Sequence, residues 1–146
     1  MPSRLLAFGL ALAGGALLVD LFLPWTRVDE YRGRNVGWNS GAGFACGLAV
    51  TLLVVWEGAR AAGVWSGWNK DGFAGFLLAA VAGLLGIGNL FLLRWASSFV
   101  PSTLQLAYGA WIGVALSVVL LIGAVLRLIE HRRLLGWAWV GERTAA

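Results

Sequence analysis

The sequence predicts an all-α integral membrane protein, a four-helix bundle with short loops and both termini in the cytoplasm. Three observations lead to this fold class: a low content of charged residues, four long apolar runs, and basic and aromatic residues gathered at the ends of those runs. The 146 residues are 60% hydrophobic and 12% charged. Soluble domains carry about 25% charged residues, so this chain has too few to cover a water-soluble fold. Its length suits a single domain, residues 1–146.

The apolar runs are expected to form the membrane helices. They occupy residues 5–23, 39–56, 73–93 and 104–126. A helix crosses the hydrocarbon core with about 20 mostly apolar residues, a length that the second run reaches only if Asn39 and Ser40 lie among the headgroups. The runs are continuous rather than alternating, which excludes membrane strands. The first run has the alternative reading of a signal peptide, but Pro24-Trp25 follows it without a cleavage site, so a retained helix is expected.

The segments between the runs are short and polar. Residues 26–40 are expected to form a hairpin around Arg32-Gly33, and residues 57–72 to lie on the inner surface. After the fourth run, residues 128–141 alternate apolar and basic groups, which is typical of an interfacial helix.

The basic residues predict the orientation, because cytoplasmic loops of membrane proteins are enriched in Lys and Arg. If the N-terminus is inside, four of the eleven lie outside, namely Arg27, Arg32, Arg34 and Arg94. The other seven lie inside: Arg4, Arg60, Lys70, Arg127, Arg132, Arg133 and Arg143. This distribution favours cytoplasmic termini, and the basic residues are expected to contact anionic lipid headgroups. Binding of nucleic acid is not expected, since the positive charges form no single patch.

The nine tryptophans suggest two aromatic belts at the membrane boundaries. The outer belt would hold Trp25, Trp38 and Trp95, and the inner belt Trp56, Trp65, Trp68, Trp137 and Trp139. Trp111 alone falls inside a run. Stacking on a cofactor is the less favoured alternative, and no cofactor is expected. Cys46 and His131 are each the only residue of their kind, so neither an internal disulfide nor a metal site built from such residues is expected.

Small residues recur at helical spacing and predict the faces on which the helices pack. The glycines assigned to helix packing are Gly43, Gly47, Gly86, Gly109 and Gly113, two pairs of which are G-x-x-x-G motifs. On the first helix the corresponding stripe is Gly9, Ala13, Ala16 and Asp20. The faces expected to point outward carry Leu10, Leu17 and Leu21 on the first helix and Val118, Leu121 and Val125 on the fourth.

Asp20 is the main candidate for a functional residue, because an acid within a membrane span is costly. Asn89, Arg94 and Gln105 fall at a similar depth, and the four residues are expected to form a polar cluster. The favoured interpretation is a structural clasp in which Asp20 is held by Asn89, Arg94 or backbone donors. The alternative is a polar site for an ion, a proton or a small solute.

Short motifs resemble a group of small four-helix membrane proteins from high-GC Gram-positive bacteria. Leu21-Phe22-Leu23-Pro24-Trp25 closes the first helix, Gly37-Trp38-Asn39-Ser40 precedes the second, and Gly109-Ala110-Trp111-Ile112-Gly113 opens the fourth. The resemblance covers the layout of most of the chain and implies the plasma membrane of a bacterium. It carries no catalytic residues.

Three classes of function are compatible with these features. A structural or accessory subunit, in a membrane assembly or a homo-oligomer, is favoured by short loops and by the lack of a reactive constellation. A small oligomeric transporter or channel is the alternative, with its polar site near Asp20, although Thr51 and Ser117 are almost the only polar residues near the helix centres. An enzyme is not expected, because paired acids, histidine clusters and cysteine pairs are missing from the sequence.

Overall fold

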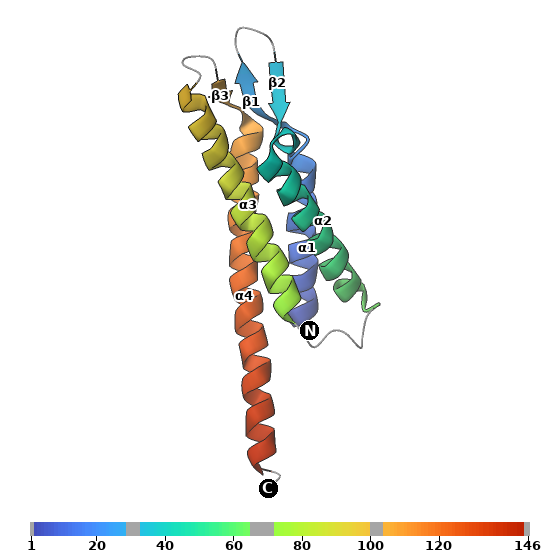
Figure 1. The fold of residues 1–146 in the computed structure, drawn as a ribbon. Helices are drawn as coiled ribbons and strands as arrows, with labels where there is room; N and C mark the ends of the chain where they lie inside the picture. The colour runs from blue at the N-terminus through green and yellow to red at the C-terminus, as the bar shows by residue number, and fades with distance from the viewer. Residues whose placement is uncertain (1, 29–32, 65–71, 100–103, 145–146) are drawn as a thin grey trace.

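The computed structural model describes the backbone of residues 2–28, 33–64, 72–99 and 104–144, and the side chains of residues 4–26, 36–38, 40–64, 73–95 and 106–132. Four helices pack together along most of their length (Figure 1). They are α1 (Pro2–Asp20), α2 (Gly41–Ala62), α3 (Gly72–Phe99) and α4 (Tyr108–Thr144). Each helix contacts the next in the chain and α1 also contacts α4, which closes a ring around a shared core. The all-α four-helix architecture predicted from the sequence is confirmed.

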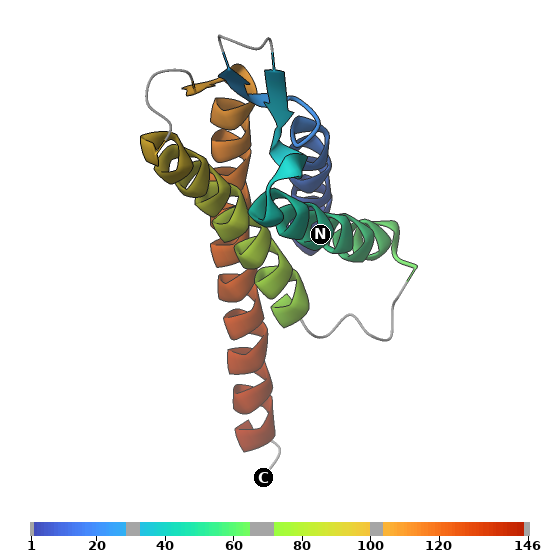
Figure 2. The same cartoon turned by 45° about the horizontal axis from the view of Figure 1, so that its top comes forward.

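Three of the helices are long and apolar enough to cross a membrane, which indicates a multi-pass membrane protein. The spans are Gly41–Ala62, Phe73–Trp95 and Tyr108–Arg132. For α1, which has 19 residues, a full crossing stays a prediction. The N-terminus and the projecting end of α4 lie at the same end of the bundle, here called the terminal end (Figures 1 and 2).

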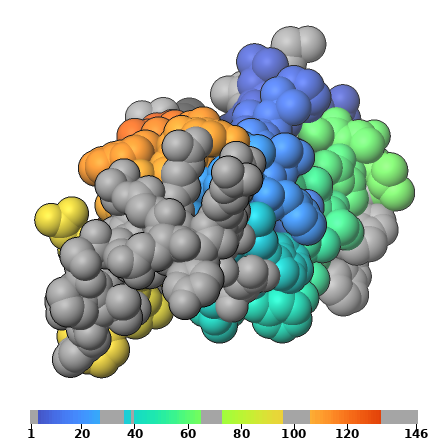
Figure 3. All heavy atoms as spheres, turned by 90° about the horizontal axis from the view of Figure 1, so that it is seen from above, coloured from blue at the N-terminus to red at the C-terminus, as the bar shows by residue number. Residues whose placement is uncertain are grey.

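A small antiparallel sheet caps the opposite end of the bundle, here called the sheet end. Its strands β1 (Pro24–Val28), β2 (Gly33–Val36) and β3 (Leu104–Leu106) lie in the order β2-β1-β3. The pairing of β1 with β2 forms a hairpin in the segment where one was expected, but Gly33, predicted at its turn, is instead the first residue of β2 and pairs with Val28. Arg32 lies outside the described residues. Seen from this end, the N-terminal segment in blue lies between α4 in orange and α2 in teal and green (Figure 3).

The third strand corrects the expected start of the fourth helix. Residues 104–106, assigned to that helix from the sequence, pair instead with β1, with Val28 opposite Leu104 and Thr26 opposite Leu106. The backbone groups of this segment are therefore used in the sheet, and α4 begins at Tyr108.

The other helix ends also differ from the hydropathy boundaries. α1 stops at Asp20 rather than at residue 23, because a turn with hydrogen bonds from Phe22 to Val19 and from Leu23 to Asp20 leads into β1. α2 begins at Gly41, with the Ser40 hydroxyl accepting from the Gly43 N–H, and ends at Ala62, where Gly63 caps the helix with a positive φ of 73°. Glycine adopts this left-handed conformation without a steric penalty. α3 continues to Phe99, past the expected residue 93.

The expected interfacial tail at residues 128–141 is a continuation of α4. The helix runs without interruption from Tyr108 to Thr144, and no proline lies in this stretch to stop it. Its 37 residues correspond to a rod of about 55 Å at 1.5 Å per residue. The rod extends well beyond the ends of α1, α2 and α3 (Figure 1).

The buried face of α1 differs in part from the one that the sequence predicted, which is correct for Ala13 and Asp20 only. Leu10, Leu17 and Leu21, expected to face outward, belong to the core, whereas Gly9 and Ala16 are exposed. Gly14, which the predicted stripe left out, makes the close approach to α2: a Cβ added there would lie 3.0 Å from Val54. On α4 the predicted outward face is correct for Val118 and Val125, which are exposed, whereas Leu121 is half-buried.

Candidate functional site

Asp20 ends α1 at the sheet end and is only 2% exposed. Its carboxyl group lies against Gly113 of α4, where an added Cβ would come within 2.6 Å of Oδ2. The indole N–H of Trp25 donates to the backbone carbonyl of Asp20 at 3.1 Å. Among the described side chains, neither carboxylate oxygen has a hydrogen-bond partner. Asp20 is therefore buried, but the predicted clasp to Asn89, Arg94 or a backbone donor is not formed among the described residues.

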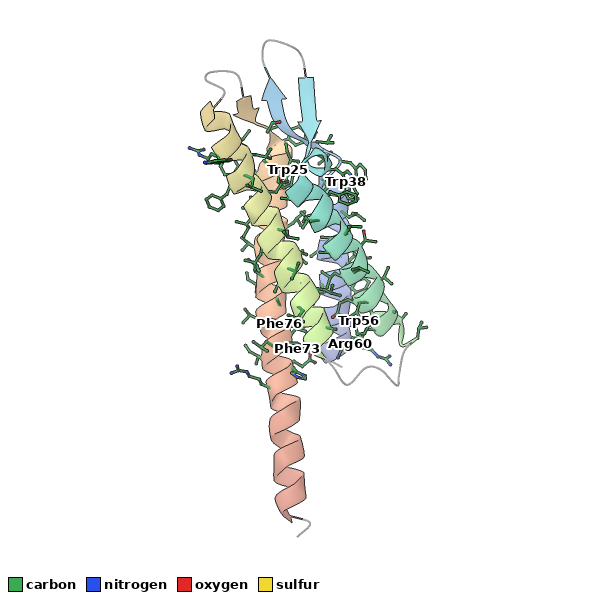
Figure 4. All side chains as sticks on the ribbon, in the orientation of Figure 1. Trp25, Trp38, Trp56, Arg60, Phe73 and Phe76 are labelled. Carbon is green, nitrogen blue, oxygen red and sulfur yellow. The ribbon has the colours of Figure 1, made fainter. Side chains whose placement is uncertain are left out.

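Trp25 is the centre of the sheet end rather than part of an aromatic belt. Its side chain is fully buried and packs over Gly37 and Gly113, where an added Cβ would collide with the ring. Beside Gly109, an added Cβ would lie 2.7 Å from the carbonyl oxygen of Pro24 and 3.1 Å from the ring. Its backbone carbonyl accepts from the N–H of Ala107, which joins β1 to the start of α4. In Figure 4, Trp25 points into the bundle near Trp38.

Trp38 lies nearer to the surface, and its place in the outer aromatic belt stays a prediction. Its ring stacks on that of exposed Phe22, with centroids 5.4 Å apart, and meets Phe44 edge-on at 5.7 Å. Gly47 lies directly beneath the ring, so that a side chain at this position would clash with Trp38. Trp95 and Trp111 are largely exposed. The side chains of Trp65, Trp68, Trp137 and Trp139 lie outside the described residues.

Asn89 is fully buried and binds the start of α2 instead of Asp20. Its Oδ1 accepts from the Ser40 hydroxyl at 2.5 Å, and its Nδ2 donates to the Gly37 carbonyl at 3.3 Å. The Ser40 oxygen in turn accepts from the Gly43 N–H at 2.8 Å. The result is a buried link between α3 and the N-terminal cap of α2.

The four residues of the predicted polar cluster thus have separate surroundings. Asp20 lies between α1 and α4, Asn89 binds the cap of α2, and Arg94 is exposed on α3. The backbone of Gln105 pairs with Arg27 in the sheet, and its side chain lies outside the described residues. A hydrogen bond between Asp20 and Asn89 is absent among the described side chains.

All five glycines assigned to helix packing are buried at contacts within the chain. A Cβ on Gly43 would meet the carbonyl of Gly37, and one on Gly86 would meet the hydroxyl of Ser117 on α4. Gly47 faces Trp38, and Gly109 and Gly113 face Trp25. These positions bring helices and connecting segments together inside one molecule, so they are not free for contacts with a second copy.

A second polar site, not expected from the sequence, lies at the terminal end. Glu57 of α2 and Arg127 of α4 are both fully buried and form an ion pair through Nη2 and Oε2. The Nε of Arg127 also donates to Glu57 Oε1 at 3.4 Å, and its Nη1 donates to Glu130 Oε2 at 2.6 Å. Gly75 of α3 makes room for this network, since a Cβ there would collide with Glu57 Oε1.

A signal for this pair is present in the sequence. Glu57 and Arg127 each follow directly on the last residue of an apolar run, the second and the fourth, and both runs end on the same side of the membrane in the predicted topology. From the sequence alone, Arg127 counts only toward the predicted orientation in the membrane, and Glu57 falls in a predicted loop. α2 instead continues to Ala62, which places Glu57 within the bundle.

The terminal end also holds His131, which is half-buried with its ring centroid 6.4 Å from that of Phe73. Figure 4 shows Phe73 and Phe76 at this end, together with Trp56 and Arg60. In the part of the chain that the structure describes, there is no group of three or more His, Cys, Asp or Glu side chains arranged to hold a metal ion.

No family model matches the chain, and no curated protein or solved structure is significantly similar to it. The resemblance of its short motifs to four-helix proteins of high-GC Gram-positive bacteria stays a prediction.

Proposed function

We propose that this protein is a non-enzymatic membrane protein that acts as a structural or accessory subunit, in a larger membrane assembly or in a homo-oligomer. The proposal includes four crossings, cytoplasmic termini and the plasma membrane of a bacterium. Its partners would be membrane lipids and other membrane protein subunits or copies of itself, and it requires no cofactor.

The observation that carries the proposal is the contrast between the interior and the outward faces of the bundle. Among the described side chains, the buried polar groups mostly serve internal contacts, as Glu57 does with Arg127 and Asn89 does with Ser40. Large apolar side chains are exposed on every helix, for example Leu12, Leu52, Leu84 and Ile122. Such faces suit either lipid or a neighbouring helix, and membrane helices associate by close packing of such surfaces.

The projecting part of α4 supports the same proposal. It continues to Thr144 beyond the other three helices, on the side where the N-terminus lies (Figure 1). A helix that leaves the bundle in this way offers a second region, besides the outward faces, through which a neighbouring subunit can be contacted.

A transporter or channel is the second candidate, and one observation favours it: the buried carboxyl group of Asp20 has no described partner. Close packing along the bundle argues against a water-filled path. A Cβ on Gly83 would lie 2.8 Å from the Ser117 carbonyl, and one on Gly86 would meet the Ser117 hydroxyl. α3 and α4 are therefore in direct contact near the middle of the bundle.

The proposal is tested by the mass of the protein after mild extraction, combined with photo-crosslinking in the membrane. A photoreactive residue replaces Leu12, Leu52, Leu84 or Ile122, one outward position on each helix, and the buried Leu120 serves as a matched control on α4. We expect a complex of fixed composition in native mass spectrometry, and crosslinks to its members from one or two of the outward positions. A monomer in nanodiscs, with lipid adducts alone at all four positions, would contradict the proposal.

A further inference from the structure

Asp20 is buried like a core residue, yet it forms no ion pair among the described residues. Its side chain is 2% exposed, and neither oxygen accepts a hydrogen bond from a described group. Glu57, the fully buried acid at the terminal end, is paired with Arg127. The two acids that are buried among the described side chains therefore differ in whether the chain itself supplies a partner.

The immediate surroundings of Asp20 offer no compensating charge among the described side chains. The nearest donor, the Trp25 indole, is bonded to the backbone carbonyl of Asp20.

The charged side chains of the surrounding helices lie elsewhere. On α1 the one other charged side chain, Arg4, lies at the terminal end, and on α2 Glu57 and Arg60 also lie there. Tyr108 and Arg94, on α4 and α3, are exposed, and Arg127 is bound to Glu57. The side chains of Arg27 and Arg34 on the hairpin lie outside the described residues.

The space around the carboxyl group is also small. Oδ2 lies 2.6 Å from the point where Gly113 would carry a Cβ, and the ring of Trp25 lies against the same glycine. Leaving a charged carboxylate unpaired in such a site costs several kcal/mol, whereas the neutral acid avoids most of this penalty. The bound species that fits between α1, Trp25 and Gly113 is therefore a proton.

We propose that Asp20 is a proton-binding site of the folded bundle. The side chain is held as the neutral acid between α1 and α4, and release of its proton to water at the sheet end weakens the contact of Asp20 and Trp25 with Gly113. This inference is independent of the assembly role, since it concerns the fold of a single copy.

The chain allows a direct spectroscopic test, because Asp20, Asp29 and Asp71 are its only aspartates. We expect protein labelled with ¹³C at the aspartate carboxyl groups, in nanodiscs at about pH 5, roughly one unit above the usual aspartate pKa, to show the infrared carbonyl band of a neutral acid. Asp20→Asn should remove this band, and Asp29→Asn, the same chemical change in the β1–β2 connection, should retain it. A wild-type spectrum with three ionised carboxylates would overturn the proposal, because it would mean that water or an ion satisfies Asp20.

A second measurement follows the stability of the bundle with pH. A proton that is bound in the folded state and released on unfolding makes stability fall as pH rises, by up to about tenfold in the unfolding equilibrium constant per pH unit. Asp20→Asn should lack this component, and Asp29→Asn should follow the wild type. Equal pH profiles for the wild type and Asp20→Asn would overturn the proposal. If Asp20→Asn does not fold, the spectrum of labelled Asp29→Asn/Asp71→Asn, in which Asp20 is the one aspartate left, decides the question.

Discussion

Glu57 and Arg127 make the terminal end of the bundle sensitive to single substitutions. Arg127 is bonded to both Glu57 and Glu130, whereas Arg127 supplies all the hydrogen bonds described for Glu57. The two partners are therefore not equivalent. Loss of the arginine leaves the fully buried Glu57 without its described hydrogen bonds, with half-buried Arg60 as the remaining positive charge that acts on it. Loss of Glu57 leaves the arginine with Glu130.

We expect Arg127→Leu to destabilise the folded protein by about 3–5 kcal/mol, the usual cost of stranding one partner of a buried ion pair. Glu57→Leu should cost less, and the double variant Glu57→Leu/Arg127→Leu should recover most of the loss. Reversible unfolding in bicelles measures all three, with Arg132→Leu, an exposed arginine on the same helix, as the control. Strictly additive effects in the double variant would show that the pair is not coupled.

At this scale the sequence identifies two of the buried polar residues, Asp20 and Asn89, but not their surroundings, and it places the buried Glu57 in a loop. Asp20 is buried, as its position on an apolar helix indicates, but Asn89 binds Ser40 and Gly37 and not Asp20. Depth along the membrane normal can be read from the position of a residue within its run. The partner depends on how the helices cross and on the course of the connecting segments, which depth does not specify.

Among the secondary-structure elements, the glycines of α3 show how closely this helix packs on α4. Gly83 lies against the Ser117 carbonyl and the side chain of Leu121, while a Cβ on Gly88 would meet nothing within 4 Å. Close approach of backbones at small residues is a main source of helix association in membranes.

We therefore expect Gly83→Ala to destabilise the bundle by about 1–3 kcal/mol, as overpacking in a filled core does. The same change at Gly88 should be neutral or slightly stabilising, because alanine is the better helix former by up to about 1 kcal/mol. Both variants are compared with the wild type by thermal unfolding in the same nanodiscs. Equal losses at the two positions would mean that α3 and α4 are not in contact at Gly83.

The helices were predictable as elements, but the buried face of α1 and the strand β3 were not. Hydropathy identifies a membrane span because the lipid and the protein core are both apolar. For the same reason, hydropathy does not distinguish the core face of α1, with Leu10 and Leu17, from the exposed face with Gly9. β3 has three residues and exists through its pairing with β1, a contact between segments nearly 80 residues apart. No local pattern encodes such a contact.

The whole molecule has a sheet at one end and both chain ends at the other (Figure 1), and the basic residues predict which end faces the cytoplasm. On a Cys46→Ala background, we expect Glu30→Cys to react with a membrane-impermeant thiol reagent added outside the cell. Ala62→Cys, at the exposed C-terminal end of α2, should react only after the cytoplasm is opened. Cys46 is buried, so its removal lowers the background. Labelling of Glu30→Cys from the cytoplasmic side alone would invert the topology.

Because α4 continues without interruption beyond the other helices, a small tilt of this helix produces a larger displacement at its C-terminal end. Arg127 is bound to Glu57 of α2, and one turn further along His131 lies against Phe73 of α3, close to the point where the helix leaves its neighbours. From His131 to Thr144 the helix measures about 20 Å at 1.5 Å per residue, so that a tilt of about 10° at His131 carries its tip roughly 3 Å. A change in the packing of α4 that is too small to disturb the core is thereby enlarged at the tip of the helix.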